Sequence, residues 1–245
     1  MGIQDRTGNR NTPTLSNVAY QRQLFWDGRA GSLETQVMGP LLNEKEMAMP
    51  SNEAVLERLL ENSEYQKLFA EAFEDGVTIV NMAYAIASYE RTLVSGNSPY
   101  DRYIAGDKTA MSAEAIRGWK LFKGKARCNI CHIPPLFADH AFHNIGIGMD
   151  QKSPDLGRYV VYKSTDDRGK FRTPMLRDIA LTGPYMHDGS MKTLMETVEI
   201  YNKGGIRNPH LTPELRRNLR LTEQEKKDIV TFLKEALTSE TRAKK

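Results

Sequence analysis

The two cysteines of this 245-residue chain lie in one pentapeptide, Cys128-Asn129-Ile130-Cys131-His132. Two thiols three positions apart can add to the two vinyl groups of one porphyrin, and the imidazole that follows can then reach its iron. The pattern therefore predicts a c-type haem that is bound covalently through Cys128 and Cys131, with His132 as the proximal iron ligand.

Two other kinds of site use a Cys-x-x-Cys pair. A thioredoxin-like redox pair does not need a histidine directly after the second cysteine. Half of a zinc site would want a second Cys/His pair at metal spacing. The remaining histidines show no such pairing in the sequence: they are His140, His143, His187 and His210. The motif therefore favours haem.

The attachment chemistry also predicts the compartment. Haem is joined to apocytochromes outside the cytoplasm, so we expect a periplasmic or otherwise exported protein. Residues 1–25 show no basic start followed by an apolar stretch, and we expect either a mature form or a sequence that lacks its front part. No window approaches 18 apolar residues, which predicts no membrane span. A net charge of +3 is too small to argue for a nucleic-acid partner.

Hydrophobic periodicity predicts a mainly α fold. Apolar residues recur at helical spacing in 55–60, 68–73, 79–93, 116–122 and 229–237. Ser112 is a good N-cap, and capping boxes begin at Ser63, Thr193 and Thr222. Residues 159–162 are at most a short strand.

Long stretches rich in Gly, Pro, Asn and Asp separate these helices, notably residues 1–50 and 133–190. Structureless loops of that length are unusual in a compact domain unless they wrap a ligand. We therefore expect haem domains with long wrapping loops. A boundary is expected at residues 96–99, which divides the chain into 1–97 and 98–245.

Seven short motifs occur in the order found in one known family. The chain resembles the bacterial di-haem cytochrome c peroxidases, which include the MauG-type enzymes, from about residue 10 to the C-terminal helix. The motifs are Arg10-Asn11-Thr12-Pro13-Thr14-Leu15, Phe25-Trp26-Asp27-Gly28-Arg29-Ala30, Asn43-Glu44-Lys45-Glu46-Met47, Ser98-Pro99-Tyr100-Asp101-Arg102-Tyr103, Leu121-Phe122, Phe142-His143-Asn144 and Pro184-Tyr185-Met186-His187-Asp188-Gly189.

The resemblance implies two cytochrome-c-like domains. Residues 1–97 would be the remnant of an N-terminal, peroxidatic domain, and 98–245 a C-terminal haem domain. Family members carry two haems, each with its own motif, whereas this sequence has one motif. We expect a sequence that lacks the first haem segment, rather than a mono-haem enzyme, with a second haem in the full-length protein. The shortened form could then be inactive.

The resemblance also implies roles for three residues near the N-terminus. Glu46 matches the distal acid that moves a proton between the two oxygens of hydrogen peroxide. Gln36 matches an amide that helps to position the peroxide, and Trp26 an indole that carries electrons between the haems. From the residues alone, Glu46 could be a solvated loop acid, Gln36 a surface amide and Trp26 a core residue.

A calcium site is a further implication of the resemblance. Asn11, Thr182 and Pro184 match positions that offer a side chain or backbone carbonyls to calcium. A hard cation accepts such neutral oxygens when water completes its shell. Alternatively, Asn11 is a turn residue and Pro184 breaks the chain.

The ligand opposite His132 distinguishes branches of the family. The family's methionine position falls on Tyr201, and a tyrosine there is similar to the MauG-type enzymes, which oxidise side chains of a partner protein. A phenolate favours ferric iron, whereas a methionine raises the potential. Met186 is the competing sulfur ligand, and Tyr201 could be a half-buried helix residue.

These observations predict a periplasmic c-type haem peroxidase. It would reduce hydrogen peroxide with electrons from a small cytochrome c or cupredoxin, or oxidise a partner protein; a homodimer is compatible with it. The first alternative is a mono-haem electron-transfer protein without peroxidase activity. The second is a sensory or scaffold protein that keeps haem only for structure.

Overall fold

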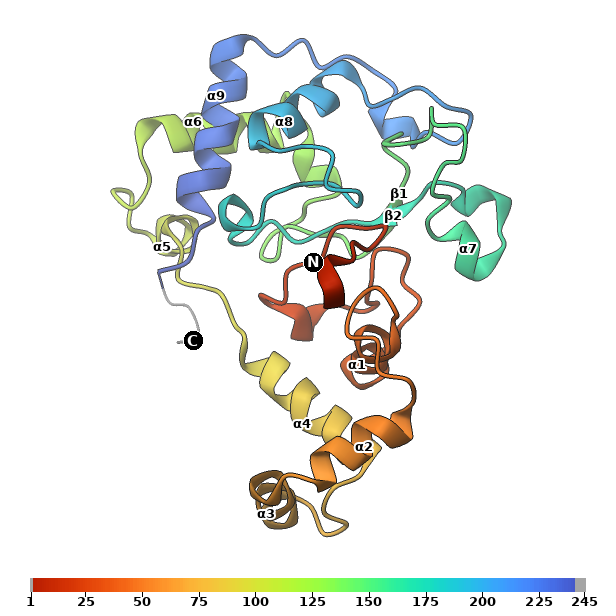
Figure 1. Ribbon diagram of the computed structural model, residues 1–245. Helices are drawn as coiled ribbons and strands as arrows, with labels where there is room; N and C mark the ends of the chain where they lie inside the picture. The colour runs from red at the N-terminus through yellow and green to blue at the C-terminus, as the bar shows by residue number, and fades with distance from the viewer. Residues whose placement is uncertain (1, 241–245) are drawn as a thin grey trace. The chain divides into compact units, whose positions relative to one another are not determined.

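Helices make up nearly all the regular structure of residues 2–240, which the computed structural model describes (Figure 1). This confirms the mainly α prediction. The α-helices of these residues are α1 (Leu33–Leu42), α2 (Asn52–Leu60), α3 (Ser63–Ala72), α4 (Ile79–Thr92), α5 (Pro99–Ala105), α6 (Ala113–Lys123), α7 (Tyr159–Tyr162), α8 (Leu194–Lys203) and α9 (Glu223–Thr231). A π-helical turn, Phe232–Ala236, continues α9. Short 3-10 turns occur at Ile3–Asp5, Val18–Tyr20, Cys128–Ile130, Thr165–Asp167, Ile179–Leu181 and Pro213–Leu215.

The described chain divides into two compact units. The first contains residues 2–9, 18–24 and 30–92, and the second contains 10–17, 25–29 and 93–240. Two segments of the N-terminal region, 10–17 and 25–29, therefore pack with the C-terminal residues. The assignment of 1–97 and 98–245 to a peroxidatic and a haem domain stays a prediction.

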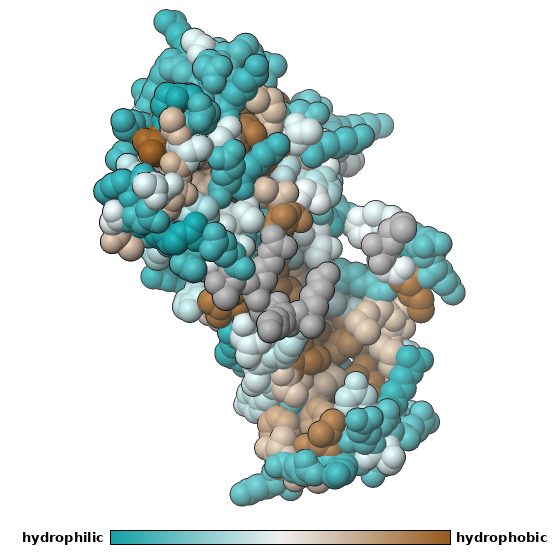
Figure 2. Space-filling model, turned by 90° about the vertical axis from the view of Figure 1, so that its left-hand side faces the viewer, coloured by the Kyte–Doolittle hydropathy of each residue, from teal (hydrophilic) through white to brown (hydrophobic). Residues whose placement is uncertain are grey.

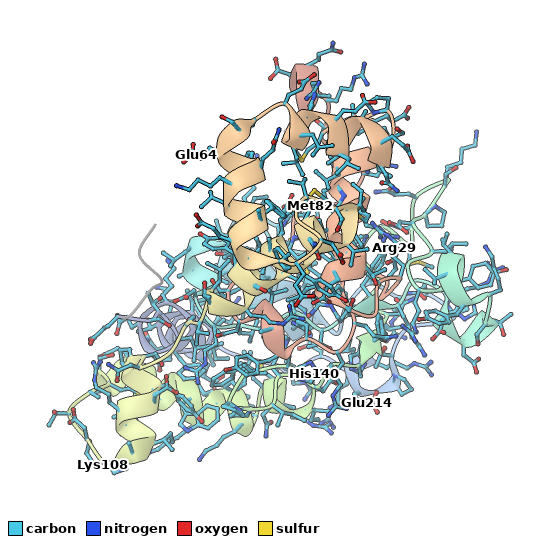
Figure 3. The ribbon with its side chains drawn as sticks, turned by 90° about the horizontal axis from the view of Figure 1, so that it is seen from below. Arg29, Glu64, Met82, Lys108, His140 and Glu214 are labelled. Atoms are coloured by element: carbon cyan, nitrogen blue, oxygen red, sulfur yellow. The ribbon has the colours of Figure 1, made fainter. Side chains whose placement is uncertain are left out.

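The first unit is built around a small core between α1 and α4. Its buried residues are Val37, Met49, Val55, Phe69 and Met82. Figure 3 shows Met82 among the helices of this unit and Glu64 on α3 pointing away from them. An ion pair of 2.6 Å between Arg91 and Glu34 joins the C-terminal end of α4 to the first turn of α1.

Two expectations for this region are corrected. Residues 1–50 were expected to be a long loop, but they contain the ten-residue helix α1. Ser63 was expected to cap α3, but the cap is Asn62, whose side-chain oxygen accepts hydrogen bonds from the backbone N–H groups of Glu64 and Tyr65. Ser63 is instead the first helical residue.

Several large apolar side chains of the first unit are exposed. Figure 2 shows hydrophobic residues at the molecular surface, coloured brown. The exposed large hydrophobic residues of the unit are Ile3, Tyr20, Leu42, Met47, Leu60, Tyr65, Leu68, Val80, Tyr84 and Tyr89. The core of this unit therefore buries only part of its apolar residues.

The second unit is centred on the crossing of α6 and α9, which lie side by side in Figure 1. A side chain larger than hydrogen at Gly118 would collide with the carbonyl oxygen of Asp228, so this glycine permits the close approach. An aromatic cluster packs around the crossing, with ring centroids 5.0–6.2 Å apart: Tyr100, Trp119, Phe122, Phe137 and Phe232.

Helix α8 is fixed against this centre by polar contacts. Its N-terminus has the predicted capping box of Thr193 and Glu196. Lys226 of α9 donates to Glu199 at 2.7 Å, and the Asn202 side chain accepts from the N–H of Leu221 at 2.9 Å. These contacts fix the rotation of α8 and so the direction of its side chains.

The only sheet within residues 2–240 pairs β1 (Phe142–His143) with β2 (Phe171–Arg172) in antiparallel fashion, with Phe142 opposite Arg172. The strand expected at residues 159–162 is instead the single helical turn α7. Arg158 lies over the Tyr162 ring, with its guanidinium carbon 4.0 Å from the centroid, a contact available when the chain turns back on itself.

None of the helices in the described part of the chain has the length and apolar character needed to cross a membrane.

Candidate haem site

One tight turn carries all three residues of the predicted haem attachment. Helix α6 ends at Lys123, and the chain reverses so that Cys128–Ile130 form a 3-10 turn. The N–H of His132 donates to the carbonyl of Cys128 at 2.9 Å, which continues the turn through the imidazole. Cys128 and Cys131 are free thiols and are not joined to each other. The turn thus presents two thiols and a histidine together, as attachment of one porphyrin requires.

The imidazole of His132 is oriented by a backbone carbonyl. Its Nδ1 atom lies 2.8 Å from the carbonyl oxygen of Phe137, which fits a tautomer with the proton on Nδ1. The lone pair of Nε2 then remains available for a metal. Burial lowers the pKa of His132, which favours the neutral ring that metals bind.

The thiol of Cys128 does not resemble that of a redox catalyst. Burial, with a smaller contribution from Cys131, raises its pKa to about 12. A thioredoxin-like pair depends on a lowered thiol pKa, which yields a reactive thiolate at neutral pH. The environment of Cys128 therefore argues against the redox-pair alternative.

The phenol of Tyr201 lies within electrostatic reach of both cysteines. Burial raises its pKa, and the thiols of Cys131 and Cys128 add to the effect. No hydrogen-bond partner for its hydroxyl is found within residues 2–240. Tyr201 thus offers an uncommitted oxygen beside the haem motif.

Met186 lies in a different setting. It adopts a left-handed backbone conformation (φ 70°), and its carbonyl oxygen is 3.5 Å from the side-chain nitrogen of Asn11. The next residue, His187, is buried and stacks on Phe171 with centroids 3.6 Å apart. These contacts tie the Met186 segment to the N-terminal region of the second unit.

A cluster that the sequence analysis missed lies beside Cys131. One ligand atom each from Cys131, Asp139 and His143 lies within 4.8 Å of the other two. Burial would lower the pKa of His143, but its 2.7 Å hydrogen bond to Asp139, together with Cys131, raises it to about 10. The spacing Asp139-x-x-x-His143 was visible in the sequence, but its proximity to Cys131 depends on the path of the loop.

Trp26 belongs to the second unit and is held by hydrogen bonds. Its indole N–H donates to the carbonyl of Asn11 at 2.7 Å, and the N–H of Asn11 donates to the carbonyl of His187 at 2.7 Å. Arg10 makes ion pairs of 2.6 Å with Asp27 and with Asp155. The indole is therefore fixed in position by its two neighbouring segments.

The residues expected to bind calcium are partly brought together. The side-chain nitrogen of Asn11 is 2.6 Å from the carbonyl oxygen of Pro184. Thr182 donates its hydroxyl to the carbonyl of Ile179 at 3.2 Å. The Pro184 carbonyl therefore accepts a hydrogen bond from Asn11, and the calcium site of Asn11, Thr182 and Pro184 stays a prediction.

Glu46 and Gln36 belong to the first unit. Gln36 lies on α1, and Glu46 lies in the following turn, which backbone hydrogen bonds from Met47 to Pro40 and from Met49 to Leu41 fold against the helix. Both side chains are half-buried, and neither has a hydrogen-bond or ion-pair partner within residues 2–240. Their polar groups are free to meet a ligand.

Comparisons with known proteins find similar sequences over most of the chain. A model of the family described as di-haem cytochrome c peroxidase matches residues 1–109. The chain is 41% identical over 238 residues to the methylamine utilization protein MauG of Methylorubrum extorquens, covering 96% of this chain and 66% of that protein. It is 41% identical over 261 residues to the cytochrome-c peroxidase IdrP1 of Denitromonas iodatirespirans, covering 94% and 68%. The chain therefore spans about two thirds of the length of these relatives.

Solved structures share the fold. A crystal structure of a MauG-like protein associated with microbial copper homeostasis matches with a TM-score of 0.85 and 31% identity, over 98% of this chain and 78% of that one. The diheme peroxidase BthA of Burkholderia thailandensis matches with a TM-score of 0.77 at 22% identity, over 98% and 75%, a likeness of fold alone. The expected cytochrome-c-like fold class is confirmed.

Proposed function

Since the chain belongs to the family of di-haem cytochrome c peroxidases and MauG proteins, we propose that it forms part of a periplasmic c-type haem enzyme that acts on hydrogen peroxide. The family consists of haem oxidoreductases that act on peroxide or on a partner protein. Electrons would come from a small cytochrome c or cupredoxin, or from the side chains of a protein substrate.

One observation carries the proposal. Cys128, Cys131 and His132 lie on one turn, and the imidazole is turned by the Phe137 carbonyl so that Nε2 is free. These residues fit a covalently bound haem, and the raised pKa of the Cys128 thiol argues against a redox-active pair.

Tyr201 is the proposed second iron ligand. Its phenol has no protein partner, lies within electrostatic reach of both thiols and sits on a helix fixed by Glu199 and Asn202. A tyrosine oxygen would favour ferric iron, and this supports a MauG-type role over that of a methionine-ligated electron acceptor.

Glu46 and Gln36 are the proposed peroxide-side residues. When bound, haem supplies the electrons that cleave the O–O bond. The Glu46 carboxylate would take the proton from the inner oxygen and return it to the outer one, so that water leaves. The Gln36 amide would hold the peroxide for that transfer. Both roles require a haem opposite them, for which we propose a second haem.

The remaining parts of the proposal concern the wider protein. Trp26, fixed by the Asn11 carbonyl, would carry electrons between the two haems. Asn11, Thr182 and Pro184 would bind calcium through a side-chain oxygen and backbone carbonyls. The periplasmic location follows from the attachment chemistry, and a homodimer stays a prediction to be tested by light scattering.

Peroxide turnover by the two-haem protein tests the function. We expect Glu46→Gln to lower turnover by ~10²–10⁴-fold, because an amide cannot relay the proton. Glu44→Gln is the matched control, since Glu44 is an exposed acid in the same turn. The haem spectra of both variants should match the wild type. Full turnover by Glu46→Gln would contradict the assignment.

Haem stoichiometry separates the proposal from an electron-transfer protein. A pyridine haemochrome assay on the product of the complete gene should give two haems per polypeptide. One haem, with reversible oxidation and no peroxide turnover, would instead favour the mono-haem alternative. Bound haem without either activity would favour a sensory or scaffold role.

A further inference from the structure

Arg172 is a buried cation without a partner of opposite charge. The residue is 5% exposed. Its Nε donates to the carbonyl of Phe25 and its Nη1 to the carbonyl of Thr173, both at 3.2 Å, and Nη2 has no partner within residues 2–240. Burial lowers the pKa of Arg172 to about 10, with no compensating acid. A buried guanidinium normally pairs with an anion, because removing the charge from water is costly.

Arg177 shows how the same chain treats a second buried arginine. It is also 5% exposed, but its two terminal nitrogens bind the carboxylate of Asp101 at 2.6 and 2.7 Å. The Nε atom of Arg177 donates to the carbonyl of Pro135 at 2.8 Å. The contrast indicates that the anion for Arg172 comes from outside the described protein atoms.

The position of Arg172 relates it to the haem motif. It lies in β2, and its N–H donates to the carbonyl of Trp26 at 2.8 Å. Two residues further along, the backbone of Pro174 acts to raise the pKa of His132, so Pro174 lies near that ring. Two extended residues span ~7 Å. This is comparable with the distance from a haem iron to the propionate groups, which lie at the porphyrin edge opposite the thioethers.

We propose that Arg172 binds a propionate carboxylate of the haem held by Cys128 and Cys131. The inference rests on the haem attachment proposed above. A planar guanidinium suits a carboxylate, since it can donate through Nη2 while its other nitrogens keep their backbone contacts. The pair would neutralise both buried charges next to Trp26. Loss of the cation would leave the propionate charge uncompensated and so favour ferric iron.

The test follows the propionate in the haem-loaded protein. Resonance Raman spectroscopy of the propionate bending mode, recorded against pH, gives the ionisation of each propionate, and redox titration gives the midpoint potential. An opposite charge nearby lowers a carboxyl pKa by ~1–3. We therefore expect Arg172→Gln to move one propionate titration up by about one to three pH units and to lower the midpoint potential. The Arg172→Lys variant, which keeps the positive charge, should shift the propionate titration less.

Arg117→Gln is the control, because Arg117 pairs with Asp228 on α6 and α9 and should leave the propionate titration unchanged. Identical titrations in wild type and Arg172→Gln would overturn the proposal. If the Arg172→Gln variant does not accumulate, the propionate titration of the wild-type protein tests the proposal by itself. Two propionates that titrate as ordinary carboxylic acids would then also overturn the proposal. Haem staining distinguishes failure of this proposal from failure of the proposed function. A protein without covalent haem would contradict the proposed function itself.

Discussion

The Nδ1 atom of His132 lies 2.8 Å from the carbonyl oxygen of Phe137, and this contact decides which ring nitrogen is available to a metal. A backbone acceptor cannot be protonated, so it holds the proton on Nδ1 over the whole physiological pH range. Histidines that bind metals in proteins commonly donate their other ring N–H to such an acceptor. This contact links the Cys-x-x-Cys-His pattern in the sequence to an imidazole oriented for haem iron.

Covalent attachment is the first prediction. After export with the cytochrome c maturation system, the wild-type chain should stain for haem on a denaturing gel, because thioether bonds survive denaturation. Cys128→Ala/Cys131→Ala should not stain. The double variant Asp139→Asn/His143→Gln should still stain, since the cluster beside Cys131 does not supply a thioether. A colourless wild-type band would contradict the haem assignment.

The second prediction concerns Glu90 on α4, which is 7% exposed and whose Oε2 atom has no partner. Burial raises its pKa. The ionised form is therefore disfavoured in the folded state, and stability is lost as the pH rises above the unfolded pKa of about 4.3. Glu90→Gln should raise the free energy of unfolding at pH 7, by about 1 kcal/mol, and flatten this pH dependence.

Urea denaturation of the full chain at pH 4 and pH 7 checks this. Glu57→Gln, at an exposed position on α2, is the control and should change stability little. A Glu90→Gln variant that is less stable than wild type at pH 7 would show that the carboxylate has a favourable partner.

The ion pair between Asp101 and Arg177 gives the third prediction. Burial would raise the pKa of Asp101, but hydrogen bonds and charge from Arg177 lower it below the usual 3.8. Its contribution to stability is thus present above the unfolded pKa and is lost as the pH falls through the folded one. Asp101→Asn should destabilise the chain by on the order of 3 kcal/mol at pH 7, because Arg177 stays buried without its carboxylate.

Thermal unfolding of Asp101→Asn and of the exposed control Asp150→Asn measures this difference. The gap between wild type and Asp101→Asn should narrow as the pH falls below 3.8. If the difference in thermal stability between wild type and Asp101→Asn does not depend on pH, the pair stabilises the fold through packing rather than charge.

Local signals in the sequence predicted local structure well. The boxes at Thr193 and Thr222 begin α8 and α9, because each threonine binds an N–H within its own first turn. Ser63 failed as a cap because Asn62, one residue earlier, offers a better acceptor to the same turn. Helix α1 was missed because Gly39 and Pro40 lie inside it, and both residues normally indicate loops.

Features that depend on distant segments could not be predicted. The approach of His143 to Cys131 and the burial of Arg172 follow from how the 133–190 loop folds back on the haem motif. Residues 159–162 have strand-forming residues, yet the packing of Arg158 against Phe142 and Tyr162 accompanies a helical turn. Composition cannot reveal such contacts.

The ligand opposite His132 is the most direct test of the account, because it decides both the haem site and the branch of the family. Ferric haem with a methionine ligand shows a near-infrared charge-transfer absorption, and tyrosine ligation does not. We predict that the haem-loaded protein lacks this band, that Tyr201→Phe alters the ferric spectrum and that Met186→Ala leaves it unchanged. A near-infrared band that persists in Tyr201→Phe and disappears in Met186→Ala would contradict the account.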